Sequence, residues 1–195
     1  NDISYLNKIE EASSIFEREQ VSLKTIVNNV FLDVHLKLEE KSIGHEIHIN
    51  NDVLLWGNTS LIYSIFRNLT DNSIAYAGED VTINVSCYRQ DDRFYYFSYF
   101  DTGVGVSEQH LNRIFERFYR VDSGRSRKMG GTGLGLSISK RLVDLMGGDL
   151  TVSSKTNKGT TFAFGLPLDI STAVFEGKKT QKITEANLDL HVLLA

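Results

Sequence analysis

A glycine-rich run in the second half of the chain has the composition of a loop that binds an anion. Its members are Gly131, Thr132, Gly133, Leu134 and Gly135, and it leads into an apolar-periodic segment, 134–146. Glycine lets a backbone approach a ligand closely. The first turn of a following helix presents unpaired N–H groups and the positive end of the helix dipole. The run therefore predicts a phosphate-binding loop, although it fits neither the P-loop nor the dinucleotide-binding pattern.

Two asparagines lie one helical turn apart in a second apolar-periodic segment. Asn68 and Asn72 fall within the predicted helix 58–76, so their amides project from the same face. Each asparagine costs a helix interior a few tenths of a kcal/mol relative to alanine. Amide oxygens suit Mg²⁺, an ion that is often shared with substrate phosphates. The pair predicts a magnesium site, and two solvent-exposed amides are the alternative.

A carboxylate follows the aromatic run 94–100, which alternates too little in polarity to be half exposed and is predicted to be a buried strand. Asp101 at the end of this strand could accept a hydrogen bond from the exocyclic amine of adenine, which guanine does not offer at the same position. A hydrogen bond to a charged group contributes about 1.5–3 kcal/mol. The sequence Asp-x-Gly is also ordinary turn chemistry. The acid is followed along the chain by a basic segment, 125–128, and then by the glycine loop. This order suits a nucleotide whose base and phosphates are held at opposite ends of a site.

Composition limits the class of protein. The 195 residues include 41% hydrophobic and 24% charged residues, with a formal net charge of -4, which is typical of a soluble globular domain and gives no reason to expect nucleic-acid binding. The single cysteine, Cys87, excludes an internal disulfide and a cysteine zinc cluster. No membrane span or signal peptide is visible. Because the first residue is Asn1, we expect the chain to be part of a longer protein.

The positioning elements follow from hydrophobic periodicity. We predict helices at 23–41, 58–76, 111–119 and 134–146, and strands at 17–21, 46–50, 81–88, 94–100, 150–154 and 160–166. Tyr5, Ile9, Ala12 and Phe16 have the spacing of a helix that packs on a partner helix. His35, in a helix, and His45 and His48, flanking a short strand, are interpreted as ordinary structural residues.

Four motifs in fixed order resemble those of the catalytic, ATP-binding domain of a bacterial sensor histidine kinase, within the superfamily that includes DNA gyrase and the Hsp90 chaperones. Residues 68–72 resemble the asparagine box, 101–105 the first glycine box, 115–120 the phenylalanine box and 131–136 the second glycine box. The phenylalanine box favours histidine kinases over the other members. The resemblance covers about 21–167 and implies an α/β fold: a two-layer sandwich with a mixed, mostly antiparallel sheet of about five strands and three main helices on one face.

The resemblance also implies residue roles. Asn72 would hold Mg²⁺, Asn68 would lie near the phosphates, and Asp101 would read adenine, with Thr160 completing the recognition. The remaining cofactor-binding positions that match are Tyr76, Gly103, Gly105, Tyr119, Arg120 and the loop residues Gly131, Thr132, Gly133, Leu134 and Gly135. Arg120 would act in catalysis with Asn68 and Asn72. Three positions depart from the pattern: Ala75 replaces a common lysine, and Thr70 and Ser73 replace leucine and alanine.

The resemblance finally predicts the domains and partners. Residues 1–16 would end a dimerisation helix, 17–167 would form the catalytic domain, and 168–195 would be a tail of unknown role. None of the five histidines has the sequence context of a phosphoacceptor. The expected partners are therefore ATP, a histidine-bearing dimerisation module of the same protein and a response regulator, with homodimerisation only in the full-length protein. We expect a cytoplasmic domain of an inner-membrane receptor. A nucleotide-binding scaffold without kinase activity and an anti-sigma-type serine kinase are the alternatives.

Overall fold

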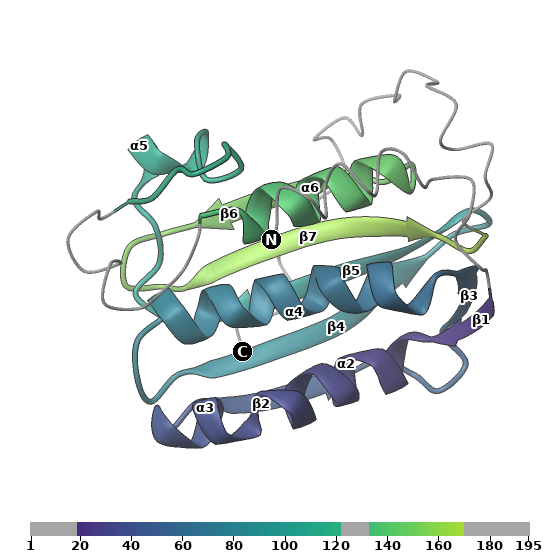
Figure 1. Cartoon of the computed structure of the whole chain (residues 1–195), viewed down its shortest axis with the longest axis horizontal. Helices are drawn as coiled ribbons and strands as arrows, with labels where there is room; N and C mark the ends of the chain where they lie inside the picture. The colour runs from purple at the N-terminus through teal and green to yellow at the C-terminus, as the bar shows by residue number, and fades with distance from the viewer. Residues whose placement is uncertain (1–18, 122–132, 170–195) are drawn as a thin grey trace.

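The protein forms a five-stranded sheet covered on one face by helices, as seen in a computed structural model that describes residues 19–121 and 133–169 (Figure 1). The strands lie in the order β2-β4-β5-β7-β6, and only the β2–β4 pair is parallel. Their bounds are β2 Gly44–His48, β4 Thr82–Gln90, β5 Phe94–Asp101, β6 Leu150–Ser154 and β7 Thr160–Pro167. The predicted mixed, mostly antiparallel sheet is confirmed.

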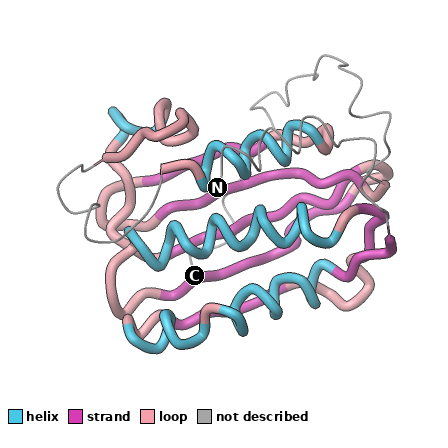
Figure 2. Tube along the Cα trace, in the orientation of Figure 1, coloured by secondary structure: helices cyan, strands magenta, loops and turns pink. Residues whose placement is uncertain are grey.

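Three main helices lie side by side over this sheet, as the ribbon and the tube both show (Figures 1 and 2). They are α2 (Leu23–Asp33), α4 (Thr59–Tyr76) and α6 (Gly135–Leu145). Two shorter helices are α3 (His35–Glu40), which continues the direction of α2, and α5 (Glu108–Leu111), which lies beyond one end of the sheet. The predicted two-layer α/β sandwich with three main helices on one face is thereby confirmed.

Helix α4 is the central helix of the layer, and its sequence explains why it forms. The Asn58 side chain caps it by accepting a hydrogen bond from the backbone N–H of Leu61 at 3.0 Å. An apolar stripe faces the sheet and is buried: Leu61, Ile62, Ile65, Phe66 and Leu69. Its opposite face carries polar residues, so burial of the stripe fixes which way the asparagines point.

The core lies between the helices and the sheet. Phe66 of α4 contacts Phe97 of β5 and Phe164 of β7, with ring centroids 6.0 and 5.6 Å apart. The Phe97 and Phe164 rings are stacked at 5.6 Å. Aromatic pairs of this kind contribute about 0.5–1.5 kcal/mol beyond their buried area. The cluster therefore fixes α4 over the two central strands, whose ends carry site residues.

A separate two-stranded antiparallel sheet joins β1 (Glu19–Ser22) to β3 (Leu54–Gly57). Strand β1 agrees with the predicted strand at 17–21 over its described residues, whereas β3 was not predicted. Leu55 of β3 is buried, and Trp56 is exposed. Strand β3 is short and three of its four residues, Leu54, Leu55 and Trp56, are apolar, so it lacks the alternation of polar and apolar residues that would identify a strand in sequence.

Three local predictions are wrong. The helix expected at 23–41 is interrupted at Val34, which has φ -113° and ψ 8° and separates α2 from α3. The strand expected at 46–50 lies two residues earlier, so His45 and His48 belong to β2 rather than flanking it. The helix expected at 111–119 does not form, because α5 ends at Leu111 and turns follow. Phe118 has a φ of 65°, which a right-handed helix excludes.

The aromatic run 94–100 is also not uniformly buried. Tyr95, Phe97 and Tyr99 are buried toward the helices, while the residues between them are half exposed. Because side chains alternate across a strand, the half-exposed ones lie on the sheet face opposite to α2, α4 and α6. The prediction of a buried strand is therefore correct for one face only.

Within 19–121 and 133–169, no helix is long and apolar enough to cross a membrane. The predictions for 1–16, for the basic segment 125–128 and for most of the tail lie outside the described residues.

Candidate nucleotide-binding site

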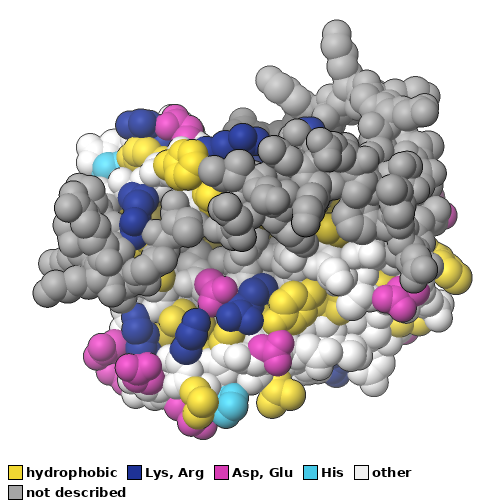
Figure 3. All heavy atoms as spheres, in the orientation of Figure 1, with side chains coloured by type: hydrophobic (Ala, Val, Ile, Leu, Met, Phe, Trp, Pro, Cys, Tyr) yellow, Lys and Arg dark blue, Asp and Glu magenta, His cyan; other side chains and the backbone are white. Residues whose placement is uncertain are grey.

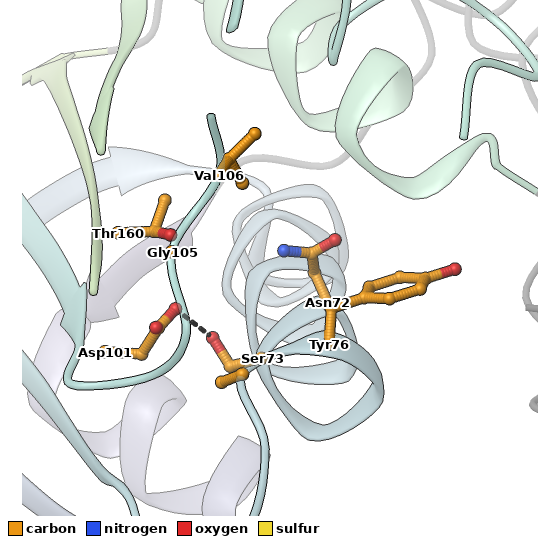
Figure 4. Close-up of a pocket in the computed structure, with 8 residues that line it drawn as sticks. Asn72, Ser73, Tyr76, Asp101, Gly105, Val106 and Thr160 are labelled. Atoms are coloured by element: carbon orange, nitrogen blue, oxygen red, sulfur yellow. Dashed lines mark hydrogen bonds between the residues drawn. The ribbon is translucent and has the colours of Figure 1, made fainter. Parts of the chain in front are cut away.

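A pocket lies at the end of α4, where the helix meets the loop after β5 and the start of β7 (Figure 4). It combines residues from segments far apart in the sequence, and its lining consists of Asn72, Ser73, Tyr76, Ala77, Asp101, Gly105, Val106 and Thr160. Five of these are predicted site residues: Asn72, Tyr76, Asp101, Gly105 and Thr160. The fold therefore brings both the expected metal ligand and the expected base-reading acid to one cavity.

Asp101 ends β5 and is only 3% exposed. Its Oδ2 accepts a hydrogen bond from the Ser73 hydroxyl at 2.9 Å, and its Oδ1 accepts one from the Gly103 backbone N–H at 3.1 Å. Burial raises the pKa of the Asp101 carboxyl above its ordinary value, and hydrogen bonds from Ser73, Gly103 and the Thr160 backbone oppose that rise. The protein thus holds the carboxylate in one orientation, with oxygens that face the pocket.

Ser73 and Thr70, two positions that depart from the family pattern, both take part in buried hydrogen bonds. Ser73 is 1% exposed and bonds Asp101, as the dashed line in Figure 4 shows. Thr70 is also 1% exposed; its hydroxyl donates to the Phe66 carbonyl at 2.8 Å and accepts from Tyr99 at 3.2 Å. The only signal in the sequence was their position: Thr70 lies midway between Asn68 and Asn72, and Ser73 directly follows Asn72. Tyr99 is fully buried, and burial raises the pKa of its hydroxyl well above the ordinary value.

The loop after Asp101 needs its two glycines for close packing. A Cβ on Gly103 would lie 2.6 Å from the Cα of Ala77, at the end of α4. Gly105 has a φ of +67°, and a Cβ there would lie 2.9 Å from the carbonyl carbon of Lys155. Real Cβ atoms do not approach other atoms so closely, so a side chain at either position would displace the loop from α4 or from the β6–β7 turn. The close approach of the chain at these two glycines is to protein atoms, and its passage beside a base stays a prediction.

Thr160 begins β7 directly opposite Asp101 in the β5–β7 register. It is 5% exposed, and its hydroxyl lies 3.0 Å from the hydroxyl of Ser154 at the end of β6. Ser154 also contacts the backbone of Gly159 and of Val106. The sequence analysis did not identify Ser154, because a serine in a strand carries no signal of a partner in another segment.

The asparagines of α4 occupy two neighbouring places. Asn72 projects from α4 across the pocket from Thr160, while the Tyr76 ring is directed away from Asp101 (Figure 4). Asn68, one turn earlier, is not among the pocket-lining residues. It packs beside Gly135, the first residue of α6, where a Cβ would meet the Asn68 side chain at 3.6 Å. Asn68 therefore connects the pocket side of α4 with the N-terminal end of α6.

The phenylalanine-box residues lie next to the start of α6 rather than in the pocket. The Phe118 N–H donates to the Gly133 carbonyl at 3.0 Å, and a Cβ on Gly133 would lie 3.4 Å from Cγ of Arg120. The Tyr119 hydroxyl is 2.6 Å from Nδ1 of His110. Leu134, 3% exposed, immediately precedes α6 and makes no side-chain capping hydrogen bond to it. The predicted residues Gly131 and Thr132 lie outside the described part of the chain.

The chemistry of the donor set fits a metal that takes most of its ligands from a bound substrate. In the described residues, no cluster of three or more His, Cys, Asp or Glu is placed to hold an ion. The Asn72 amide offers one neutral oxygen at the pocket wall. Mg²⁺ bound through one or two protein oxygens, with phosphates and water as its other ligands, matches such a site.

Comparison with known proteins is consistent with this geometry. Residues 57–170, more than half of the chain, match the family described as histidine kinase-, DNA gyrase B-, and HSP90-like ATPase. The chain is 37% identical over 175 residues to the hybrid signal transduction histidine kinase B of Dictyostelium discoideum, covering 87% of this chain and 9% of that protein. It is 32% identical over 173 residues to the sensor histidine kinase WalK of Bacillus subtilis, covering 86% of this chain and 28% of that protein. The chain thus spans only 9% and 28% of the lengths of these two relatives.

The fold is also similar to solved structures. The catalytic domain of the histidine kinase ThkA superimposes with a TM-score of 0.69 at 23% identity, over 80% of this chain and 99% of that one. This likeness supports the architecture, while the sequence match supports the family. The chain therefore belongs to the histidine kinase-, DNA gyrase B- and HSP90-like ATPase family, and both curated relatives named above are histidine kinases.

Proposed function

We propose that this domain binds Mg-ATP in the pocket at the end of α4, and that the full-length protein transfers the γ-phosphoryl group to a histidine on its own dimerisation module. The observation that carries this proposal is the placement of Asp101. A buried, hydrogen-bonded carboxylate forms one side of the pocket whose opposite wall holds the Asn72 amide. A base-reading acceptor and a metal-ligating oxygen are the two groups that a magnesium nucleotide needs at its two ends.

We assign the residue roles from the resemblance, and the positions of Asn72, Asp101 and Thr160 around one pocket support them. Asp101 and Thr160 would contact the purine, Gly103 and Gly105 would let the chain pass close to it, and Asn72 would ligate the metal. Mg²⁺, when bound, neutralises charge on the phosphates and aligns them. Asn68 and the first turn of α6 would lie beside the phosphates, because an α-helix N-terminus favours an anion. The remaining proposed contacts are Tyr76, Tyr119, Arg120, Gly131, Thr132, Gly133, Leu134 and Gly135.

In the transfer itself, the bond between the γ-phosphorus and the β,γ-bridging oxygen breaks, ADP leaves, and a phosphorus–nitrogen bond forms on the acceptor imidazole. The domain's contribution to this step would be to position the nucleotide and to balance its charge. Arg120 would place a fixed positive charge near the transferred group. The acceptor histidine would belong to a dimerisation module whose last helix ends within 1–16, with 17–167 as the catalytic domain and 168–195 as an appended tail.

A titration with Mg-ATP tests the binding proposal, with Asp101→Asn as the loss variant. The substitution removes a charged acceptor, and we expect affinity to fall about 10- to 100-fold. Asp92→Asn, on the exposed β4–β5 turn, is a matched control that should bind like the unchanged chain. Equal binding by the two variants would contradict the proposed base contact, and no binding by the unchanged chain would contradict the proposed site.

Phosphoryl transfer is tested separately, by adding Mg-ATP labelled on the γ-phosphate and a histidine-bearing dimerisation module of a related kinase. Acid-labile label on that module supports the kinase function. Binding of ATP without transfer would favour the second candidate, a nucleotide-binding scaffold, for which the replacement of a common lysine by Ala75 is the specific observation. We further propose that the domain belongs to a cytoplasmic part of a membrane receptor that signals to a response regulator, which membrane fractionation of the full-length protein tests.

A further inference from the structure

The hydroxyl of Ser154 lies where three groups of the site meet. Its Oγ is 2.8 Å from the Gly159 carbonyl oxygen, 2.8 Å from the Val106 backbone nitrogen and 3.0 Å from the Thr160 hydroxyl. Val106 and Thr160 both line the pocket. Ser154 itself is not part of the lining, so it acts on the pocket through these two neighbours.

The direction of each of these hydrogen bonds can be worked out, because a serine hydroxyl has one hydrogen and two lone pairs. The Gly159 carbonyl can only accept, so it takes the Ser154 hydrogen. The Val106 N–H can only donate, so it occupies one lone pair. The third bond must then use the hydrogen of Thr160 and the second lone pair of Ser154. The Thr160 oxygen consequently has only lone pairs left to offer a ligand.

Ser73 makes Asp101 an acceptor, as Ser154 does for Thr160. The Ser73 hydroxyl donates to Oδ2 (Figure 4). The Gly103 N–H donates to Oδ1. Donors on both oxygens favour the ionised carboxylate, which can only accept. Since Asp101 and Thr160 are opposite each other in the β5–β7 register, two acceptor oxygens lie next to each other at this end of the pocket.

We propose that Ser73 and Ser154 are positioning residues that determine base specificity, by committing the hydrogens of the site so that Asp101 and Thr160 both act as acceptors. This inference rests on the proposed nucleotide site, and it adds the two serines to it. A 6-amino purine presents N–H donors to such a pair. A 6-oxo purine presents a third acceptor to two acceptors that have no hydrogen to give, and it is rejected because its oxygen stays unpaired.

Ser73, Asp101 and Thr160 are too buried for water to replace a lost serine as hydrogen-bond donor. Ser73, Asp101 and Thr160 are 1%, 3% and 5% exposed. Removal of either serine hydroxyl should therefore turn an acceptor of the site into a possible hydrogen-bond donor. Without Ser154, the Thr160 hydroxyl is free to rotate and donate. Without Ser73, one oxygen of Asp101 loses its donor and the carboxyl takes up a proton more readily.

The test compares the binding of Mg-ATP and Mg-ITP, whose bases carry an amino and an oxo group at position 6. For Ser154→Ala and for Ser73→Ala, we expect the preference for ATP over ITP to fall about tenfold, through weaker ATP binding and stronger ITP binding. Ser153→Ala, at an exposed position of the same strand, and Ser64→Ala, whose hydroxyl bonds a carbonyl of its own helix, are the controls. Ser154→Thr keeps a hydroxyl and should restore the preference.

The outcomes separate the two proposals. A lack of ATP binding by the unchanged chain contradicts the nucleotide site itself. If the unchanged chain prefers ATP and both alanine variants keep the same ATP-to-ITP ratio as their controls, the role of the serines is refuted while the site stands. Should Ser154→Ala fail to fold by circular dichroism, the Ser73→Ala and Ser64→Ala pair decides the question alone.

Discussion

Replacing Gly159 with alanine should damage both stability and nucleotide binding, because this residue supports the backbone of Asp101 from the β6–β7 turn. Gly159 has a φ of +90°, and a Cβ there would lie 2.9 Å from Cε2 of Phe100 and closer still to the Asp101 carbonyl oxygen. A left-handed conformation costs a residue with a Cβ about 1–2 kcal/mol. Overpacking a tight site adds about 1–3 kcal/mol. We therefore expect the free energy of unfolding to fall by roughly 2–5 kcal/mol.

Urea denaturation and Mg-ATP titration measure the two effects. For a domain of this size, each kcal/mol corresponds to about 2–4 °C in Tm, so Gly159→Ala should melt roughly 4–20 °C lower. Affinity for ATP should fall about tenfold, because relief of the contact moves Asp101. Saturating ATP should then stabilise the variant less than the unchanged chain at the same concentration, since stabilisation by a ligand follows its affinity.

Gly44→Ala is the control for this experiment. Gly44 lies in β2 with ordinary φ, and a Cβ there would meet only the Thr82 hydroxyl, at 3.6 Å. Its unfolding free energy should stay within about 0.5 kcal/mol of the original value. A Gly159→Ala variant with the urea midpoint and the ATP affinity of Gly44→Ala would refute the reasoning that this turn holds Asp101 in place.

Three further predictions test the site and its support. Thr70→Val removes the Thr70 acceptor from the buried Tyr99 hydroxyl, whose other side-chain partner is Ser73, and should lower the free energy of unfolding by about 1–3 kcal/mol, whereas Tyr99→Phe should cost about 0.5–1.5 kcal/mol; equal urea midpoints would contradict the importance of the Thr70 hydrogen bond. Because the pKa of Asp101 is raised, ATP affinity should begin to fall at a pH above the ordinary titration range of an aspartate as the solution is acidified, and titrations of Asp101→Asn should lack this component. Gly133→Ala should lower the melting temperature because φ at this residue is +71°. Gly135→Ala should leave the melting temperature unchanged or raise it, because φ there is ordinary and the new Cβ would come no closer than 3.6 Å to Asn68. A lower melting temperature for Gly135→Ala than for Gly133→Ala would contradict this description of the two glycines.

Much of the fold could be predicted from the sequence because its main elements are locally consistent. The polar cap at Asn58 and the apolar stripe that follows it define α4 without reference to the rest of the chain. The hairpin of β4 and β5 was likewise recognisable from two apolar runs and a short polar turn. The helix expected at 111–119 failed because the spacing of Ile114, Phe115 and Phe118 is helical, yet their environment is set by contacts with other segments, such as the hydrogen bond from Phe118 to Gly133.

The candidate site likewise contains some residues that the sequence reveals and others that only the folded chain reveals. Asn72 and Asp101 stand out because amides in a helix and an acid at a strand end are unusual enough to need a reason, whereas Thr160 was expected only from the resemblance. Ser73 and Ser154 do not stand out, since serine is common and its function depends on distant partners. Ser73 lies 28 positions from Asp101, and Ser154 lies 48 positions from Val106. Only the folded chain shows which hydroxyl donates to which group.

The place of β7 in the sheet has a consequence for biosynthesis. Although β7 is the last strand of the described chain, it is inserted between β5 and β6 and carries Thr160 to its place opposite Asp101. A ribosome delivers this strand after both of its neighbours, so β6 has no strand of the sheet to pair with until translation has passed Pro167. A truncated polypeptide would accordingly lack one wall of the cavity, and the ability to retain a nucleotide would distinguish finished chains from unfinished ones.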